Sequence, residues 1–215
     1  MQNISSLIFD LDGTISDPSL GISRSINHAL VTHGFREISP EEVASEIGPP
    51  LDGTFRKFCP ESDPAVIARL IATYRERYAE IGYSENQIYP GIAESLQALS
   101  AKGIRMGVCT SKRKDFAEKI LNLFGVLSYF TFVNGGDIGV QKRDQLSGLL
   151  RTGEIDHLAV MIGDRDVDIS SAKVNGLRSI GVLWGFGDLA ELSEAGAEVI
   201  LGGTDELWKL VAWSE

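Results

Sequence analysis

The stretch Ile4-Ser5-Ser6-Leu7-Ile8-Phe9-Asp10-Leu11-Asp12-Gly13-Thr14 decides the fold that we expect for this chain. Its apolar beginning has the composition of a buried strand, and the strand ends at two carboxylates and a glycine. Ligands of open α/β sheets bind at the carboxyl ends of the strands. Two acids two residues apart on extended chain can face one metal ion or one substrate, and a cation would relieve their repulsion.

As a bare pattern, the two acids and the glycine also fit a simple turn or a calcium-binding loop. A calcium loop needs further acids at alternate positions and a glutamate at its end. The chain instead continues as Thr14-Ile15-Ser16-Asp17, which lacks that arrangement. We therefore favour a site at a sheet edge, with the turn and the calcium loop as alternatives.

The rest of the chain alternates short apolar segments with stretches of helical spacing. Apolar residues recur three or four positions apart, as at Phe116, Ile120 and Phe124, which is typical of helices with one buried face. This alternation predicts an α/β fold, a Rossmann-like parallel sheet with helices on both faces. The expected strands are 4–9, 104–110, 129–134, 158–162 and 178–182.

About ninety residues separate the first two expected strands, far more than one crossover helix requires. Most of this interval has helical spacing, and we expect helices at 20–33, 40–47, 51–58 and 64–81. The chain is therefore expected to form a Rossmann-like core of residues 1–16 and 88–215, with an inserted α-helical cap domain of residues 17–87.

The composition excludes several classes of protein. The chain has 215 residues, 43% of them hydrophobic, and this is the balance of an ordinary globular protein. The 30 acidic and 20 basic residues give a formal charge of −10, which would repel a nucleic acid polymer but permits small anionic ligands. Cys59 and Cys109 fit neither a disulfide framework nor a metal site. The sequence shows no membrane-spanning run and no export signal, so we expect no membrane partner and a cytoplasmic location. We also expect a monomer or a homodimer.

Two further groups of polar residues follow expected strands. Thr110 and Ser111 come just before an expected helix; hydroxyls there can hold an anion, although they are more often ordinary helix caps. Gly163, Asp164 and Asp168 follow the strand 158–162, and the two acids would face the first pair if they share its sheet edge. Such a cluster of acids requires a cation.

A single lysine, Lys142, precedes an amphipathic helix and is the candidate for a fixed cation at this edge. With it, the polar groups resemble, in order and position, the motifs of the haloacid dehalogenase superfamily of phosphohydrolases, and the resemblance covers essentially the whole chain. The family's Asp-x-Asp-x-Thr, its hydroxyl residue, its basic residue and its Gly-Asp-x-x-x-Asp match, in that order, Asp10, Asp12 and Thr14, then Thr110, then Lys142, then Gly163, Asp164 and Asp168.

The resemblance implies a catalytic role for four of these residues. Asp10 would be the nucleophile that forms an aspartyl-phosphate, and Asp12 the general acid and base that protonates the leaving oxygen and then activates water. Thr110 and Lys142 would complete the catalytic set by masking negative charge.

The resemblance also implies a metal ion. Mg²⁺ would bind Asp10, Asp12 and Asp164, with Asp12 contributing its backbone carbonyl, and an all-oxygen ligand set suits Mg²⁺ better than zinc. The remaining implied roles are phosphate binding by Thr110, Ser111, Lys142 and Gly13, and support of the site by Asp168, Gly163 and Thr14.

Three positions depart from the family's usual pattern. Ser111 stands where Asn is frequent, Arg143 where a Pro is usual, and Arg165 where Ser or Thr is common. Arg165, together with Gly185-Phe186-Gly187, resembles the phosphoglycolate phosphatase-like or 5′-nucleotidase-like branch.

The cap would read the part of the substrate that is not phosphate. Its candidate residues are Gly48, in a loop that faces the active site in related enzymes, and the cations Arg56 and Lys57, although surface solvation is the more common state of such side chains. The expected function is a Mg²⁺-dependent phosphatase of a small phosphorylated metabolite, either phosphoglycolate or a nucleoside 5′-monophosphate. A phosphosugar mutase and a non-catalytic regulatory or binding protein of the same fold are the alternatives.

Overall fold

The computed structural model describes residues 4–44, 47, 51–60, 62–136 and 140–213. The chain divides into two compact units, which we describe separately. Unit 1 is Met1–Asp17 with Ile88–Glu215, and unit 2 is Pro18–Gln87. The sequence predicts boundaries after residues 16 and 87. The first predicted boundary is one residue earlier than the one in the structure, and the second is at the same place.

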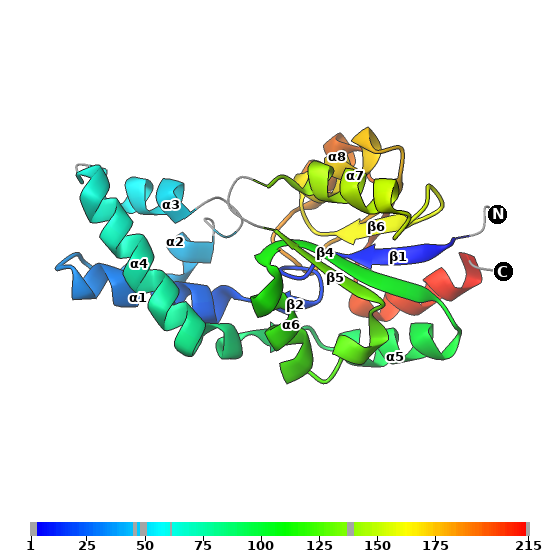
Figure 1. The fold of residues 1–215 in the computed structure, drawn as a ribbon, viewed down its shortest axis with the longest axis horizontal. Coiled ribbons are helices and arrows are strands. Elements are labelled where there is room, and N and C mark those ends of the chain that lie inside the picture. The colour runs from blue at the N-terminus through cyan, green and yellow to red at the C-terminus, as the bar shows by residue number, and fades with distance from the viewer. Residues whose placement is uncertain (1–3, 45–46, 48–50, 61, 137–139, 214–215) are drawn as a thin grey trace. The chain divides into compact units, whose positions relative to one another are not determined.

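Unit 1 contains a six-stranded sheet in which every pair of neighbouring strands is parallel (Figure 1). The strand order is β5-β4-β1-β6-β7-β8. The predicted α/β fold is therefore confirmed. The strands are β1 (Ser6–Phe9), β4 (Arg105–Arg113), β5 (Phe132–Gly136), β6 (Val160–Gly163), β7 (Arg178–Val182) and β8 (Val199–Leu201).

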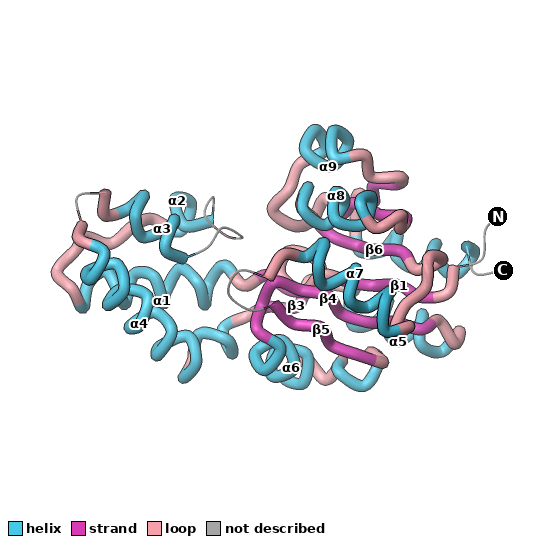
Figure 2. Tube along the Cα trace, turned by 45° about the horizontal axis from the view of Figure 1, so that its top comes forward, coloured by secondary structure: helices cyan, strands magenta, loops and turns pink. Residues whose placement is uncertain are grey.

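Helices cover both faces of this sheet (Figures 1 and 2). One face carries α7 (Lys142–Thr152) and α8 (Asp166–Val174), with α9 (Leu189–Ala195) beside α8. The other face carries α5 (Ile92–Ala101), α6 (Lys114–Leu123) and the carboxyl-terminal 3₁₀ helix Thr204–Trp213. Among the described residues, no helix combines the length and apolarity that crossing a bilayer would demand.

β1 lies in the middle of the sheet, and its side chains are covered on both faces. Leu7, Ile8 and Phe9 have no exposed surface, which explains why the strand is a continuous apolar run without polar alternation. From β1 the chain proceeds to β4 and β5 on one side and then to β6, β7 and β8 on the other. Such a reversal of strand order opens a crevice at the carboxyl ends of the strands beside it.

Some strands differ from those expected. β4 continues past Thr110 to Arg113 through a register irregularity against β5, because pairing resumes where Arg113 faces Gly136. The sixth strand, β8, has only three residues and gives too short an apolar run to be recognised. The two-residue strands β2 (Ser16–Asp17) and β3 (Gln87–Ile88), which pair as a separate small sheet, carry no pattern at all.

Unit 2 is helical, as the spacing predicts. It consists of α1 (Ser19–Thr32), α2 (Pro40–Ala44), α3 (Leu51–Phe58), α4 (Pro64–Glu80) and a 3₁₀ turn, Gly82–Glu85. α4 begins where Asp63 Oδ1 accepts a hydrogen bond of 2.7 Å from the Ala65 amide, a typical N-cap. Its buried face stacks the rings of Tyr74 and Tyr78, whose centroids are 5.6 Å apart.

A partly buried carboxylate, that of Glu85, ties the 3₁₀ turn to α1 and α4 of unit 2. Arg77 donates two hydrogen bonds to its oxygens, of 2.9 and 3.1 Å, and Arg24 donates one of 2.8 Å. Burial alone would raise the pKa of Glu85, but the hydrogen bonds and charges of the two arginines lower it below its ordinary value of 4.5. The carboxylate therefore stabilises the folded unit in its charged form.

Replacing Glu85 with Gln is expected to lower the free energy of unfolding at pH 7 by about 1–2 kcal/mol, because charge-assisted hydrogen bonds are lost. A lowered pKa stabilises the protein above the pKa of the unfolded chain, so the difference from wild type should disappear in acid, once the pH is below the lowered pKa of Glu85. Urea unfolding at both pH values measures it. Glu80→Gln, at an exposed position of α4, is the matched control and should match wild type at both.

Candidate active site

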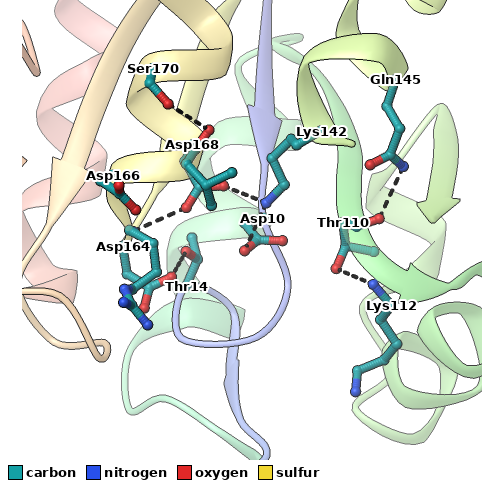
Figure 3. Close-up of polar contacts among 12 residues, drawn as sticks. Asp10, Thr14, Thr110, Lys112, Lys142, Gln145, Asp164, Asp166, Asp168 and Ser170 are labelled. Carbon is teal, nitrogen blue, oxygen red and sulfur yellow. Dashed lines mark hydrogen bonds and ion pairs between the residues drawn. The ribbon is translucent and has the colours of Figure 1, made fainter. Parts of the chain in front are cut away.

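The carboxyl ends of three adjacent strands bring together the residues that the sequence analysis singled out. Asp10 follows β1, Thr110 lies on β4, and Asp164 follows β6. The Asp10 amide donates to the Ile162 carbonyl at 2.9 Å, which fixes the start of the loop after β1 against β6. Figure 3 shows these side chains and Lys142 converging at the sheet edge.

Lys142, the first residue of α7, is the cation at the centre of the site. It is 2% exposed, and its Nζ lies 3.0 Å from Asp10 Oδ2 and donates a short hydrogen bond to Asp168 Oδ1. Burial alone would lower the pKa of Lys142, but the charges of Asp10 and Asp168 raise it above its ordinary value. The lysine is therefore a permanent positive charge between two carboxylates.

Asp164 and Asp168 are fully buried. Burial, together with the charge of Asp10, raises the pKa of Asp164 to about 7 and that of Asp168 to about 6, although Lys142 opposes both shifts. Both Asp168 oxygens are engaged, since Oδ1 accepts from Lys142 and Oδ2 accepts from the Arg165 amide at 3.1 Å. Asp168 thus orients the lysine.

The same acids form a site that suits a hard cation. Asp10, Asp164 and Asp168 each offer an oxygen atom within 4.8 Å of the others. Asp10 Oδ1 is buried and has no hydrogen-bond partner among the described residues. A buried carboxylate oxygen left in this way needs a cation or a donor, and a set of oxygen ligands favours Mg²⁺ or Ca²⁺ over softer metals.

The side chain of Asp12 points to a different partner. Its Oδ2 forms an ion pair of 2.9 Å with Lys112 Nζ, while its Oδ1 is buried without a partner among the described residues. Burial raises the pKa of Asp12, the charge of Asp10 adds to this, and Lys112 opposes it. The carboxyl groups of Asp10 and Asp12 therefore have separate surroundings, one beside Lys142 and the other beside Lys112.

Two glycines let the backbone approach the acids closely. Gly13 has a φ of 85°, a region that favours glycine, and a Cβ there would overlap the carboxylate of Asp164. A Cβ on Gly163 would overlap Asp168 in the same way. Thr14 Oγ1 lies 3.3 Å from Asp164 Oδ1, so the loop after β1 is joined to the loop after β6.

Thr110 is 2% exposed and lies on the opposite side of Asp10 from the acids (Figure 3). Its Oγ1 accepts a hydrogen bond of 3.2 Å from the Lys112 amide, which leaves the hydroxyl hydrogen able to donate to a ligand. Its carbonyl accepts from Gln145 Nε2 at 3.0 Å. Ser111, the next residue, is exposed.

Comparisons with known proteins agree with this geometry. The family model described as haloacid dehalogenase-like hydrolase matches residues 7–182, a range that includes every strand-end residue described above. The chain belongs to the haloacid dehalogenase-like hydrolases. The resemblance noted in the sequence is thereby confirmed.

Several relatives of this hydrolase are named as phosphatases. It is 36% identical to a 5′-nucleotidase of Pseudomonas aeruginosa over 191 residues, which cover 87% of this chain and 86% of that protein. It is 30% identical to a phosphoglycolate phosphatase of Aquifex aeolicus over 192 residues, 84% of this chain and 85% of the relative. The crystal structure of a predicted phosphatase from Clostridium acetobutylicum superposes with a TM-score of 0.87 at 32% identity, covering 98% of this chain and 99% of that one.

The candidate cap residues of this hydrolase belong to unit 2, whereas the strand-end residues belong to unit 1. Arg56 and Lys57 are exposed residues of α3, and Gly48 lies outside the described residues. Their assignment to substrate reading stays a prediction.

Sequence reasoning missed two parts of the site. Lys112 is not among the residues that the sequence predicts for the site, although its position two residues after Thr110 puts it near the same edge. Trp184 contacts the loop after β1, and Phe186 contacts the loop after β6. The glycines around these two residues are the only feature of the sequence that points to the contacts.

Replacing Lys142 with Met is expected to destabilise the metal-free protein by about 3–5 kcal/mol, because it leaves Asp10 and Asp168 buried without their cation. Urea unfolding in the presence of a chelator measures this loss. The matched control is Lys114→Met on α6, where the lysine side chain is 62% exposed, and about 0.5 kcal/mol or less is expected. Equal stability of the two variants would contradict the charge balance described here.

Proposed function

We propose that this phosphatase of the haloacid dehalogenase-like family hydrolyses a small phosphomonoester in a Mg²⁺-dependent reaction, through an aspartyl-phosphate on Asp10. The observation that carries the proposal is the state of Asp10. One of its oxygens is held by Lys142, and the other is buried without a partner among the described residues, at the carboxyl end of the central strand. Asp10 is thus held in place by Lys142 and by its strand while its other oxygen is not engaged by these residues, which supports its assignment as the nucleophile.

In the first step, a carboxylate oxygen of Asp10 attacks phosphorus, and the bond between phosphorus and the substrate's ester oxygen breaks. Asp12 gives its proton to that leaving oxygen, so the alcohol departs neutral. The separate surroundings of the two carboxyls, with Lys142 beside Asp10 and Lys112 beside Asp12, support the assignment of different roles to them.

In the second step, Asp12 takes a proton from water, and the water oxygen attacks the phosphorus of the aspartyl-phosphate. The bond between phosphorus and Asp10 breaks, which releases inorganic phosphate and restores the carboxylate. The first step brings the Asp10 carboxylate toward an anionic phosphoryl group, and the second builds negative charge on the attacking water oxygen, so the phosphoryl oxygens need positive charge and hydrogen-bond donors.

The chain supplies such groups on the sides of Asp10. Lys142 contributes its charge, Thr110 its hydroxyl, and we assign Ser111 and Gly13 to the same phosphate-binding set. Mg²⁺, bound by Asp10, Asp164 and the backbone carbonyl of Asp12, would supply further positive charge for the phosphoryl oxygens. The buried oxygens of Asp10 and Asp164 support this ligand set, with Asp168, Gly163 and Thr14 in support.

The names of two relatives point to the substrate class. One is a 5′-nucleotidase and another a phosphoglycolate phosphatase, so we propose a nucleoside 5′-monophosphate or phosphoglycolate. Arg56 and Lys57 of unit 2 are our candidates for contact with a second anionic group. The acidic composition supports a small metabolite over a nucleic acid polymer as partner, and we propose a cytoplasmic enzyme that acts as a monomer or homodimer.

Phosphate release from a substrate panel tests this proposal. The panel contains phosphoglycolate, nucleoside 5′-monophosphates, hexose phosphates and an aryl phosphate, each with Mg²⁺ and with a chelator. We expect release from one preferred compound with Mg²⁺ and a loss of at least about 100-fold with the chelator. Release that is unaffected by the chelator would contradict the metal site, and no release by the folded protein would favour a phosphosugar mutase or a non-catalytic protein.

Replacing Asp10 with Asn is expected to abolish phosphate release, because an amide cannot act as the nucleophile. The measurement is the steady-state rate on the preferred substrate, with circular dichroism to verify the fold. Asp166→Asn, at an exposed acid of α8, is the matched control and should keep nearly full activity. An Asp10→Asn enzyme that retains more than a few per cent of activity would overturn the assignment of the nucleophile.

A further inference from the structure

The segment Trp184–Gly187, which follows β7, lies against both loops that carry the acids of the site. The Phe186 amide donates a hydrogen bond of 2.8 Å to Asp164 Oδ2. The indole Nε1 of Trp184 donates one of 2.9 Å to the carbonyl of Thr14, and the hydroxyl of Thr14 lies 3.3 Å from Asp164 Oδ1. Both oxygens of one carboxylate are thus reached from this segment, one directly and one through Thr14.

The glycines of this segment are needed for close approach to Asp164. Neither Gly185 nor Gly187 has a positive φ, so backbone conformation is not the reason that glycine occupies these two positions. A Cβ on Gly185 would overlap the carbonyl of Gly13 and the side chain of Asp164, and one on Gly187 would overlap the carbonyl of Asp164. The backbone after β7 therefore packs directly on the acid.

The hydrogen bonds of Asp164 leave it able to bind a cation. An ionised carboxylate has about four acceptor positions, and the contacts with Thr14 and Phe186 use two of them. Groups that hold a metal ligand in this way fix its orientation, and their loss typically weakens metal binding 10- to 100-fold.

We infer that Trp184 is a positioning residue for the metal site: its indole N–H anchors the loops after β1 and β7 to each other, and thereby holds Asp164 in the orientation that binds the cation. This inference rests on the proposed role of Asp164 as a metal ligand. Trp184 itself touches neither the metal nor the substrate in this scheme. Its effect is on metal affinity, and not on the chemistry once the metal is bound.

Trp184→Phe removes the N–H and keeps an aromatic ring. The matched control is Trp208→Phe, since Trp208 is 60% exposed in the carboxyl-terminal 3₁₀ helix. Binding of Mn²⁺ to each protein without substrate is measured by electron paramagnetic resonance, and binding of Mg²⁺ by calorimetry. We expect Trp184→Phe to bind either ion about 10- to 100-fold more weakly than wild type, and Trp208→Phe to bind as wild type does.

The Mg²⁺ dependence of phosphate release separates a role of Trp184 in metal binding from a general role in stabilising the fold. The Mg²⁺ concentration for half-maximal phosphate release should rise by the same factor in Trp184→Phe, while kcat returns to the wild-type value at saturating Mg²⁺. Unchanged metal affinity in this variant, or activity lowered equally at every Mg²⁺ concentration, would overturn the inference. If wild type itself binds no metal, the proposed metal site fails as well, and the wild-type titration identifies that case.

Two further measurements keep the test decisive if Trp184→Phe folds poorly. Gly185→Ala leaves the indole in place but pushes on Asp164, and should weaken Mn²⁺ binding, whereas Gly148→Ala, where a Cβ meets nothing within 4 Å, should not. In wild type, Mg²⁺ should shift the indole N–H resonance of Trp184 and leave that of Trp208 in place. An unmoved Trp184 resonance, or normal binding by Gly185→Ala, would overturn the inference.

Discussion

The cluster of buried acids at the carboxyl edge of the sheet depends on the positive charge of one ammonium group, that of Lys142. It joins the end of β1, through Asp10, to α8, through Asp168, and it does so from the first turn of α7. Buried carboxylates repel one another and lose their hydration, so this charge offsets the cost of bringing the acids of the loops after β1 and β6 together. The remaining imbalance, three acids against one lysine in the same cluster, is what makes a divalent cation a fitting addition.

The surroundings of the two acids of the first motif differ although they are only two residues apart. Asp10 lies at the strand end beside Lys142, and Asp12 lies in the following loop beside Lys112. The turn that follows Asp12 depends on Gly13, whose left-handed backbone brings it against Asp164. A single sharp loop therefore produces two electrostatic environments, and this separation supports the division of labour that we propose for the acids.

The parts of this structure that could be predicted from the sequence are those that depend on local pattern. β1 is buried on both faces, so its residues form a continuous apolar run, and the spacing in α4 reveals its buried face. β8 and the small strands β2 and β3 are too short to give any periodicity. The ion pair of Lys112 with Asp12 depends on how one loop turns, and the contact of Trp184 with Thr14 joins residues 170 positions apart. Neither follows from spacing.

The long separations within the site also bear on synthesis of the chain. Asp10 and Thr14 are translated long before Asp164, since Thr14 and Asp164 are 150 positions apart, and Phe186, which donates a hydrogen bond to Asp164, follows later still. During elongation on the ribosome, unit 2 can fold while the first motif still lacks every partner that neutralises it, since domains generally fold as they emerge. The active site is therefore incomplete until the chain through Phe186 has left the exit tunnel.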